Sequence, residues 1–436
     1  MSGAMEFRVE PGGVLTGRLR VPGDKSISHR AVMLGAVAEG ITEVTGFLEG
    51  EDSLATLAAF RAMGVAVDGP ENGRVRIEGV GLHGLKPPPG PLELGNSGTS
   101  MRLLAGLMAG QAFDSVLTGD ASLSRRPMNR IMEPLRDMGA QLTGTAAGTA
   151  PLHIQGGRSL HGIDYALPVA SAQVKSCVLL AGLYGAGQTC VTEPAPTRDH
   201  TERMLAGMGY AVQRTGARVC LAGGGRLRGG SIGIPADISS AAFFLVGASI
   251  APGSDLVLEN VGMNPTRTGV LDVLGLMGAD IEVLNRRESG GEPVGDLRVR
   301  GAPLRGITVP PELVPLAIDE FPALFVAAAC AEGRTVLTGA AELRVKESDR
   351  IQVMADGLAA LGIDAVPTAD GMVIQGGTLQ GGQVSSHGDH RIAMAFAMAA
   401  LRSRGPVQIL DCANVNTSFP GFAGLAAGVG LGIQTR

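Results

Sequence analysis

An internal repeat constrains the fold of this chain more than any other feature of its sequence. Leu-x-Gly follows a short apolar segment six times, beginning at Leu15, Leu82, Leu160, Leu227, Leu304 and Leu379. Between these copies, helical patterns end in a second series of glycines, namely Gly64, Gly139, Gly209, Gly278, Gly362 and Gly430. The two series predict an α/β chain of six βαβαββ repeats of about 70 residues, each of which buries its core only against its neighbours.

The two ends of the chain each carry part of one repeat. The sixth repeat stops at GIQTR without its closing strands, whereas residues 1–22 read as closing strands with no helices before them. We therefore expect the N-terminal segment to complete the last repeat. Three repeats make about 200 residues, a suitable size for one core, so the chain should form two lobes. We place the first lobe at 23–235 and the second at 1–22 plus 236–436, with two crossing strands that allow closure on a ligand.

Composition and charge exclude several classes of protein. The longest apolar runs, such as AMAFAMAAL, are too short to cross a bilayer and read as buried helices. The five cysteines are scattered and form no CxxC pattern, and the seven histidines form no ligand-spaced cluster. We therefore expect no disulfide framework, no metal, and a reducing, cytoplasmic location. A net charge of −5 without basic tracts argues against binding of nucleic acid.

Polar residues gather where the first helix of each repeat begins. These starts read GDKSISHR, GNSGTSMR, ASAQVKS, DISSAA, IDEFP and GDHRIAM. Ordinary capping accounts for DISSAA, but not for the added charges at the other starts, which are Lys25, Arg30, Arg102, Lys175, Glu320 and Arg391. Cations are unfavourable at the positive end of a helix unless a ligand neutralises them. The pattern therefore predicts anion binding at a cleft that these helix starts face.

The loops before the second helices add further charge. They read GDASLSRRPM, PAPTRDHTER, NPTRTG and ELRVKESDR. Arg267 and Asp199 fit an ordinary solvated face. Lys346 beside Glu347 is different, because an ammonium next to a carboxylate in an anion-binding cleft offers both a proton donor and a proton acceptor.

Eight segments, in their order and intervals, resemble the 5-enolpyruvylshikimate-3-phosphate synthases. They are PGDKSISHRA, GNSGTSMR, TGDASLSRRPM, SAQVKS, IDEFP, ELRVKESDRI, DHRIAMAFA and TSFP. The resemblance covers essentially the whole chain and implies a two-lobed enolpyruvyl transferase fold with a double-strand crossover. It also implies transfer of the enolpyruvyl group of phosphoenolpyruvate to the 5-hydroxyl of shikimate 3-phosphate, a shikimate-pathway reaction that uses no cofactor.

The resemblance also implies which residues contact the two substrates. Shikimate 3-phosphate would contact Lys25, Ser26, Arg30, Ser171, Ala172, Gln173, Arg198, Asp319 and Lys346. Phosphoenolpyruvate would contact Lys25, Asn96, Gly98, Arg126, Gln173, Arg350 and Arg391. Asp319 resembles the base that receives the 5-hydroxyl proton, Glu347 resembles the acid that protonates the methylene carbon, and Lys25 reaches both substrates.

A few positions depart from the family pattern. Thr417 stands where many members have Lys, so one phosphoenolpyruvate contact is missing or is supplied by another residue. Ala172 and Leu103 replace the Ser and Pro of one branch and place the chain nearer the second class of the family. Gly98 is nevertheless kept where well-known members of that class have Ala, so we expect glyphosate to inhibit in competition with phosphoenolpyruvate. We expect the protein to be a monomer.

Two other functions are compatible with the repeats. The sister enzymes that transfer enolpyruvyl to UDP-N-acetylglucosamine typically carry a catalytic Cys and a Lys-Asn pair near the start, whereas this chain has Lys25-Ser26 and no Cys before Cys177. A non-catalytic binding protein built from repeats would have no need for Asp319 or Glu347. A P-loop is excluded because Asp24 stands in place of the required Gly.

Overall fold

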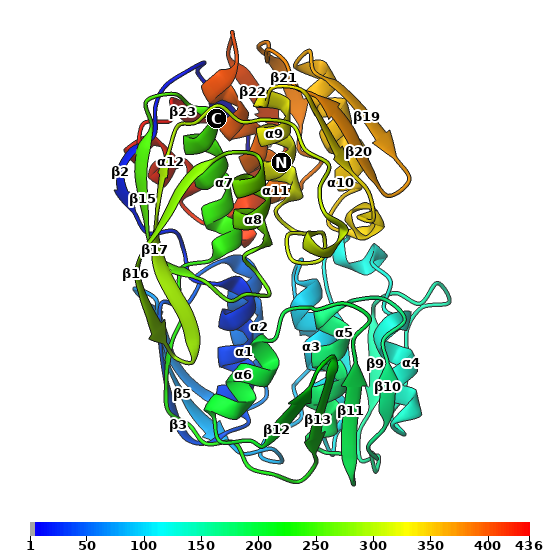
Figure 1. Ribbon diagram of the computed structural model, residues 1–436. Helices are drawn as coiled ribbons and strands as arrows, with labels where there is room; N and C mark the ends of the chain where they lie inside the picture. Colours follow the sequence, from blue (N-terminus) through cyan, green and yellow to red (C-terminus); the bar gives the residue numbers. More distant parts are fainter. Residues whose placement is uncertain (1–4) are drawn as a thin grey trace. The chain divides into compact units, whose positions relative to one another are not determined.

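The computed structural model describes residues 5–436, in which helices and strands alternate along the chain (Figure 1). The described residues divide into two compact units. The internal unit comprises Gly23–Ile234 and Ser289–Gly291. The terminal unit comprises the described residues up to Pro22, Pro235–Glu288 and Glu292–Arg436, so it contains both ends of the described chain. The lobe boundaries drawn from the sequence stay a prediction.

The internal unit consists of three helix pairs and three four-stranded sheets. Its helices are α1 (Lys25–Ala36), α2 (Glu51–Ala62), α3 (Gly98–Ala109), α4 (Asn129–Asp137), α5 (Ala172–Gly182) and α6 (His200–Gly207). Its strands are β3 (Glu39–Thr45), β4 (Ala66–Glu71), β5 (Arg74–Val80), β6 (Leu92–Glu93), β7 (Ser115–Thr118), β8 (Gln141–Thr143), β9 (Leu152–Gln155), β10 (Asp164–Ala166), β11 (Gln188–Thr192), β12 (Val212–Thr215), β13 (Arg218–Ala222) and β14 (Ser231–Gly233).

The terminal unit repeats this plan, except that one of its sheets has three strands instead of four. Its helices are α7 (Ile238–Ile250), α8 (Gly269–Leu276), α9 (Phe321–Cys330), α10 (Arg350–Ala360), α11 (His390–Ala399) and α12 (Phe422–Gly428). Its strands are β1 (Phe7–Val9), β2 (Thr16–Leu19), β15 (Asp255–Gly262), β16 (Asp280–Ser289), β17 (Glu292–Arg300), β18 (Arg334–Leu337), β19 (Asp364–Thr368), β20 (Gly371–Gln375), β21 (Gly382–Ser385), β22 (Val407–Leu410) and β23 (Ile433–Thr435). The expected α/β class and the six repeats are thereby confirmed.

Strand pairing closes each unit on itself. In the internal unit the last strand, β14, pairs in parallel with β3, the first. In the terminal unit β1 lies between β22 and β23, so the N-terminus completes the last repeat as predicted. The second N-terminal strand differs from that prediction, because β2 pairs in parallel with β15 of the fourth repeat. Strand β10 of the internal unit is placed in the same way, because it pairs in parallel with β11 of the following repeat.

Two structural features explain why glycine recurs at the repeat positions. The second series follows α2, α4, α6, α8, α10 and α12, and its φ angles run from 83° at Gly209 to 115° at Gly430. That backbone conformation strains residues with a Cβ and ends the helix. In five of the six Leu-x-Gly copies, backbone atoms approach the glycine closely. A Cβ at Gly162, for example, would lie 2.1 Å from the carbonyl oxygen of Gln188 in β11. The exception is Gly17, which has a positive φ of 98° instead.

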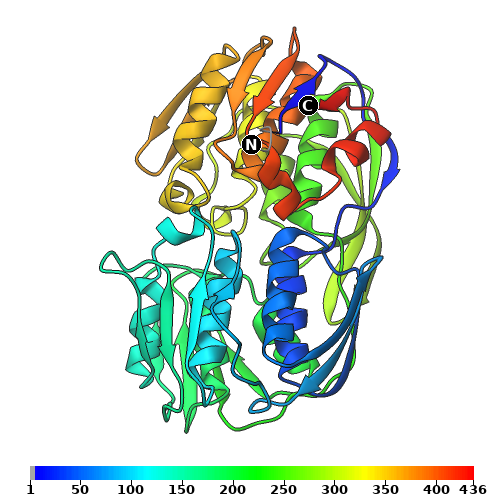
Figure 2. The same ribbon diagram turned by 180° about the vertical axis from the view of Figure 1, so that it is seen from behind.

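The first helix of each repeat is buried among the other elements. All residues of α7 are buried, and α9 and α11 are almost entirely so. A helix that is apolar all round belongs in a core, which explains the AMAFAMAAL run. In both units the sheets lie outside these helices (Figure 2). Among the described residues, no helix is long and apolar enough to cross a membrane.

The structure contains a disulfide, although the scattered cysteines predicted no disulfide framework. Cys190 in β11 and Cys220 in β13 form a disulfide with a Cα–Cα distance of 4.1 Å. The two residues face each other directly in the antiparallel register of these strands. They are 30 residues apart in the sequence, and only the strand register brings them together. Cys177, Cys330 and Cys412 are free thiols.

A buried polar cluster joins α1, α2 and α3. The Nδ1 atom of His29 lies 2.8 Å from the Thr56 hydroxyl and 3.2 Å from the Ser100 hydroxyl. Its Nε2 atom lies 3.4 Å from the hydroxyl of Ser97, the residue that caps α3. Burial lowers the pKa of His29 well below its usual value, and the nearby positive charges of Lys25 and Arg30 lower it further. His29 is therefore neutral in the folded protein at pH 7.

This burial predicts a pH-dependent contribution to stability. Below pH ~6.5 the unfolded chain binds a proton at His29 that the folded chain does not, so the free energy of unfolding should fall, by up to about 1.4 kcal/mol per pH unit. The variant His29→Gln lacks this group and should show a shallower decrease between pH 6.5 and 5. Denaturant unfolding at several pH values measures both slopes, and equal slopes would contradict the assignment.

Candidate active site

In the internal unit, direct contacts join the N-terminal turns of α1, α3 and α5. Gln173 of α5 donates to the Thr99 hydroxyl at 2.9 Å and accepts from Arg102 at 2.6 Å, which links α5 to α3. Arg30 of α1 donates to Ser176 of α5 at 2.9 Å. The His29 cluster supplies the link between α1 and α3. Three positive helix ends therefore lie together within the internal unit, an arrangement that suits the binding of an anion.

Lys25, the first residue of α1, forms an ion pair with Asp52 of α2. The Lys25 side chain is 22% exposed, whereas that of Asp52 is only 4% exposed. A buried carboxylate thus holds the ammonium group at the helix end. The sequence analysis missed Asp52, although the residue lies in the first turn of its helix, where acidic residues are common.

The Asn96–Gly98 turn holds a second cation. Arg126, which is 8% exposed, donates to the Asn96 side-chain oxygen at 2.6 Å, and the Asn96 amide donates to Asp120 at 2.7 Å. Gly98 begins α3 next to this guanidinium. A Cβ at Gly98 would lie 3.0 Å from a terminal nitrogen of Arg126 and 2.9 Å from one of Arg102. The absent side chain therefore leaves room for two guanidinium groups.

The other predicted residues of the internal unit lie at α1, at α5 and before α6. Arg30 is only 3% exposed and donates to Thr201 at 2.7 Å and to the Ser26 carbonyl at 2.9 Å. Ser171 caps α5, and Ala172 is its first residue. Arg198 is half-buried in the loop that precedes α6.

In the terminal unit, one buried arginine gathers the predicted carboxylates. Arg350 is 1% exposed and begins α10. Its guanidinium donates to Glu347 at 2.6 Å, to Asp389 at 2.8 Å and to Asp319 at 3.3 Å. The predicted base and the predicted acid therefore share one cation. Sequence reasoning missed Asp389, whose visible role in GDHRIAM is that of a helix cap.

Electrostatics favour the charged forms of Arg350 and Asp389. Burial alone would raise the pKa of Asp389, but the attraction of Arg350 outweighs it and lowers that pKa. Burial would lower the pKa of Arg350, whereas Asp389, Glu347 and Asp319 together raise it. The arginine therefore stays protonated at any physiological pH.

Two further cations border the same carboxylates. The Nζ atom of Lys346 lies 3.3 Å from Asp319, and Arg391 at the start of α11 donates to the Asp319 carbonyl at 3.0 Å. Arg391 also lies 3.9 Å from the buried Glu320. Every site residue predicted in the terminal unit thus contacts another member of the set.

Two expectations about other residues need correction. Arg267 does not lie on a solvated face: it is 2% exposed and bonds to Asp237 at 3.1 Å and to Ser239 at 2.7 Å. Asp199 is also buried, at 8% exposed, and pairs with Arg203 at 2.9 Å. These charged side chains can be buried because each forms an ion pair with a residue of opposite charge. The spacing of residues in the sequence does not reveal such pairs.

Thr417, at the position of the missing family lysine, is buried and donates to the Asn414 carbonyl at 2.7 Å. In the described part of the chain, no group of His, Cys, Asp and Glu residues could hold a metal ion.

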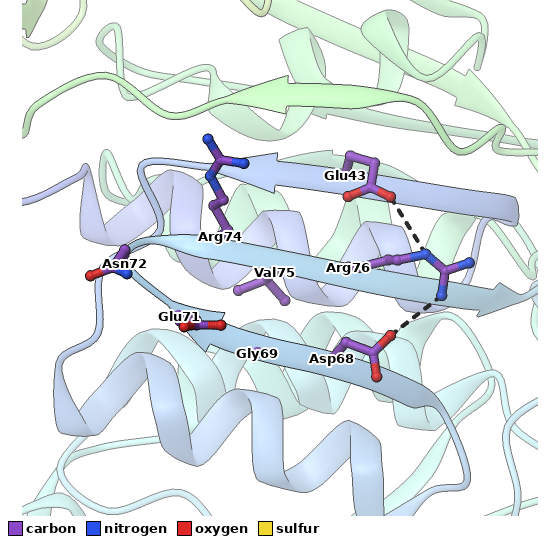
Figure 3. A pocket seen from close by; sticks show the side chains of 8 residues that line it. All are labelled: Glu43, Asp68, Gly69, Glu71, Asn72, Arg74, Val75 and Arg76. Atoms are coloured by element: carbon purple, nitrogen blue, oxygen red, sulfur yellow. Dashed lines mark hydrogen bonds and ion pairs between the residues drawn. The ribbon is translucent and has the colours of Figure 1, made fainter.

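Figure 3 shows a surface pocket of about 540 Å³ on β3, β4 and β5. It contains none of the predicted residues, and its Arg76 is already paired with Glu43 and Asp68.

The chain is similar to known proteins over nearly all of its length. The family model described as EPSP synthase (3-phosphoshikimate 1-carboxyvinyltransferase) matches residues 9–425. The chain is 72% identical over 430 residues to the 3-phosphoshikimate 1-carboxyvinyltransferase of Alkalilimnicola ehrlichii, covering 98% of this chain and 96% of that protein. It is 70% identical over 430 residues to the protein of the same name from Nitrosococcus oceani, covering 99% and 97% respectively.

Solved structures extend the comparison to three dimensions. The EPSP synthase of Acinetobacter baumannii superposes with a TM-score of 0.89 at 60% identity, covering 99% of this chain and 100% of that one. The enolpyruvyl transferase NikO of Streptomyces tendae has a TM-score of 0.79 at 16% identity, covering 100% and 99%, and so shares the fold. Because the family model and relatives at 70% identity or more span nearly all of its length, the chain belongs to the EPSP synthase family.

Proposed function

We propose that the protein transfers the enolpyruvyl group of phosphoenolpyruvate to the 5-hydroxyl of shikimate 3-phosphate and releases phosphate, in aromatic amino-acid biosynthesis. Membership of the EPSP synthase family supports this reaction. The observation that most directly supports this chemistry is that the buried Arg350 donates hydrogen bonds to both Asp319 and Glu347. A non-catalytic binding protein would have no use for such a pair of reacting carboxylates.

Phosphate release from the purified protein tests the proposal. Phosphate should appear only when shikimate 3-phosphate and phosphoenolpyruvate are both present. UDP-N-acetylglucosamine in place of shikimate 3-phosphate tests the sister reaction and should give no phosphate. Release with that acceptor alone, or with neither, would overturn the proposal.

We assign binding of the phosphorylated acceptor chiefly to the internal unit, through Lys25, Ser26, Arg30, Ser171, Ala172, Gln173 and Arg198, with Asp319 and Lys346 at the ring hydroxyls. Positive helix ends and cations attract a phosphate there. Arg30 also fixes the Ser26 carbonyl, and other donors of its guanidinium bind Ser176 and Thr201.

Phosphoenolpyruvate carries a phosphate and a carboxylate, and we assign it to Arg126, Arg350 and Arg391. Planar guanidinium groups bind both anions in a bidentate manner. Asn96 acts through Arg126, which it holds at 2.6 Å, and Gly98 keeps the space beside that guanidinium open. Lys25 and Gln173 serve both substrates.

The proposed chemistry consists of addition followed by elimination. Asp319 takes the proton of the 5-hydroxyl while the 5-oxygen bonds to the central carbon of phosphoenolpyruvate, and Glu347 gives a proton to the methylene carbon. The product is a tetrahedral ketal phosphate. Loss of a methyl proton then restores the double bond as phosphate leaves. In this scheme the cationic side chains stabilise the charges that develop during the reaction, so the reaction needs no metal or organic cofactor.

We also propose that the protein acts as a monomer in the cytoplasm. All assigned residues belong to one chain, so no second copy is needed to complete the set. Both substrates are multiply charged phosphate esters, which a membrane retains inside the cell. Light scattering measures the molar mass of the purified protein in solution. The mass of a monomer is expected, and the mass of a dimer would contradict the proposal.

The proposed base leads to a direct prediction. Asp319→Ala should lower kcat about 10²–10⁴-fold, because the 5-hydroxyl proton loses its acceptor. The Kd for shikimate 3-phosphate should stay within about tenfold, since a lost base acts mainly on the transition state. Steady-state kinetics and calorimetry measure the two effects. The exposed Asp356 of α10 offers the matched control Asp356→Ala, and wild-type kcat in Asp319→Ala would remove Asp319 from the mechanism.

Glyphosate is proposed to compete with phosphoenolpyruvate, and Gly98→Ala tests how. The new methyl group would press on the movable ends of Arg102 and Arg126, so the fold should persist while both ligands bind less well. Overpacking costs about 1–3 kcal/mol. Glyphosate is the longer ligand in its extended form and should lose more affinity.

The measurement is the Ki of glyphosate beside the KM of phosphoenolpyruvate in the wild type and in Gly98→Ala. We expect the ratio of Ki to KM to rise in the variant. Gly275→Ala is the matched control, because a Cβ at Gly275 meets no atom within 4 Å. An unchanged ratio would rule out the steric explanation.

A further inference from the structure

A fully buried lysine lies between two buried glutamates in the internal unit and is not among the residues assigned to the two substrates. The Lys175 side chain in α5 is 0% exposed. Its Nζ atom lies 2.9 Å from Glu193 and 2.7 Å from Glu202 of α6. The two glutamate side chains are 1% and 8% exposed. We call these three residues the Lys175 cluster.

Stability does not explain the Lys175 cluster. Burial costs each ion several kcal/mol, and apolar residues of similar volume often replace buried ion pairs without loss. The single ammonium also balances only one of the two carboxylates. Arg214 comes within 3.7 Å of Glu193, but its side chain is 37% exposed, so solvent weakens that contact. A role other than stabilisation is therefore needed.

The glutamates of the Lys175 cluster hold the chain on both sides of Arg198, in the loop between β11 and α6. At the near end, Thr197 donates its hydroxyl to Glu193. At the far end, Glu202 lies in the first turn of α6, next to Thr201, which Arg30 holds at 2.7 Å. Arg198 follows Thr197 directly, so its backbone has little freedom between these anchors.

The same lysine belongs to the helix that begins with other predicted substrate contacts. The Lys175 amide donates to the Ser171 carbonyl at 3.1 Å, within the first turn of α5. Ser171, Ala172 and Gln173 therefore form one rigid piece with Lys175. Through the ion pairs, that piece is tied to the loop of Arg198.

We propose that Lys175, Glu193 and Glu202 are positioning residues that hold Arg198 in place for the phosphorylated acceptor. This inference rests on the proposed function. The three side chains are buried and do not touch the substrate themselves. They fix a guanidinium before the substrate arrives, which reduces the entropy lost on binding.

The variant Glu202→Gln tests the inference with little risk to folding, because it leaves Lys175 and Glu193 as a balanced pair. We expect the Kd for shikimate 3-phosphate, measured by calorimetry, to rise about tenfold, the effect of roughly one lost charge-assisted contact. The KM for phosphoenolpyruvate should change less than twofold. Glu133→Gln, on an exposed face of α4, is the matched control and should bind like the wild type.

A double-mutant cycle separates positioning from general loosening of the fold. If Glu202 acts through Arg198, then Glu202→Gln should add almost nothing to the Kd once Arg198→Met is present. Thr197→Val removes the other anchor and should behave in the same way. Equal Kd values for the wild type and both anchor variants, or fully additive effects, would overturn the inference. A wild-type protein that binds no shikimate 3-phosphate would overturn the proposed function, and this inference with it.

Discussion

The predicted site residues of the terminal unit depend on one buried guanidinium. Arg350 is 1% exposed, and carboxylates of Asp319, Glu347 and Asp389 meet it from three elements. A charge so deeply buried persists only when opposite charges and hydrogen bonds replace its water. The arginine fork has donors for all three acids, whereas a lysine ammonium is a point charge without that planar geometry. The positions of the proposed base and acid therefore follow from this one residue.

The two units use the same repeat for different electrostatic tasks. At the helix starts of the internal unit, Lys25, Arg30 and Arg126 dominate, and their partners are mostly hydroxyls, amides and carbonyls. In the terminal unit, carboxylates are interleaved with cations of similar number. An excess of cations suits the binding of anions, while paired acids and bases suit proton transfer. The repeat supplies six equivalent helix starts, and their side chains decide which task each unit performs.

The sequence predicted those features that depend on neighbouring residues. The left-handed glycines of the second series, such as Gly64 and Gly139, follow helices and end them, so the repeat and the helix starts could be read directly. Features that depend on which elements meet in space were missed. Asp52 and Asp389 appear in the sequence only as helix-start acids, and their cations lie on other helices. The Cys190–Cys220 disulfide and the burial of Arg267 likewise follow from strand register and helix packing.

The most direct test of the central role of Arg350 is the kcat/KM for phosphoenolpyruvate of Arg350→Lys, read beside its free energy of unfolding. The variant keeps the positive charge but loses the planar fork that joins Asp319, Glu347 and Asp389. We expect a folded protein whose kcat/KM has fallen by about a hundredfold or more, equivalent to at least about 2.7 kcal/mol of transition-state stabilisation. A folded variant with nearly wild-type kcat/KM would contradict the account.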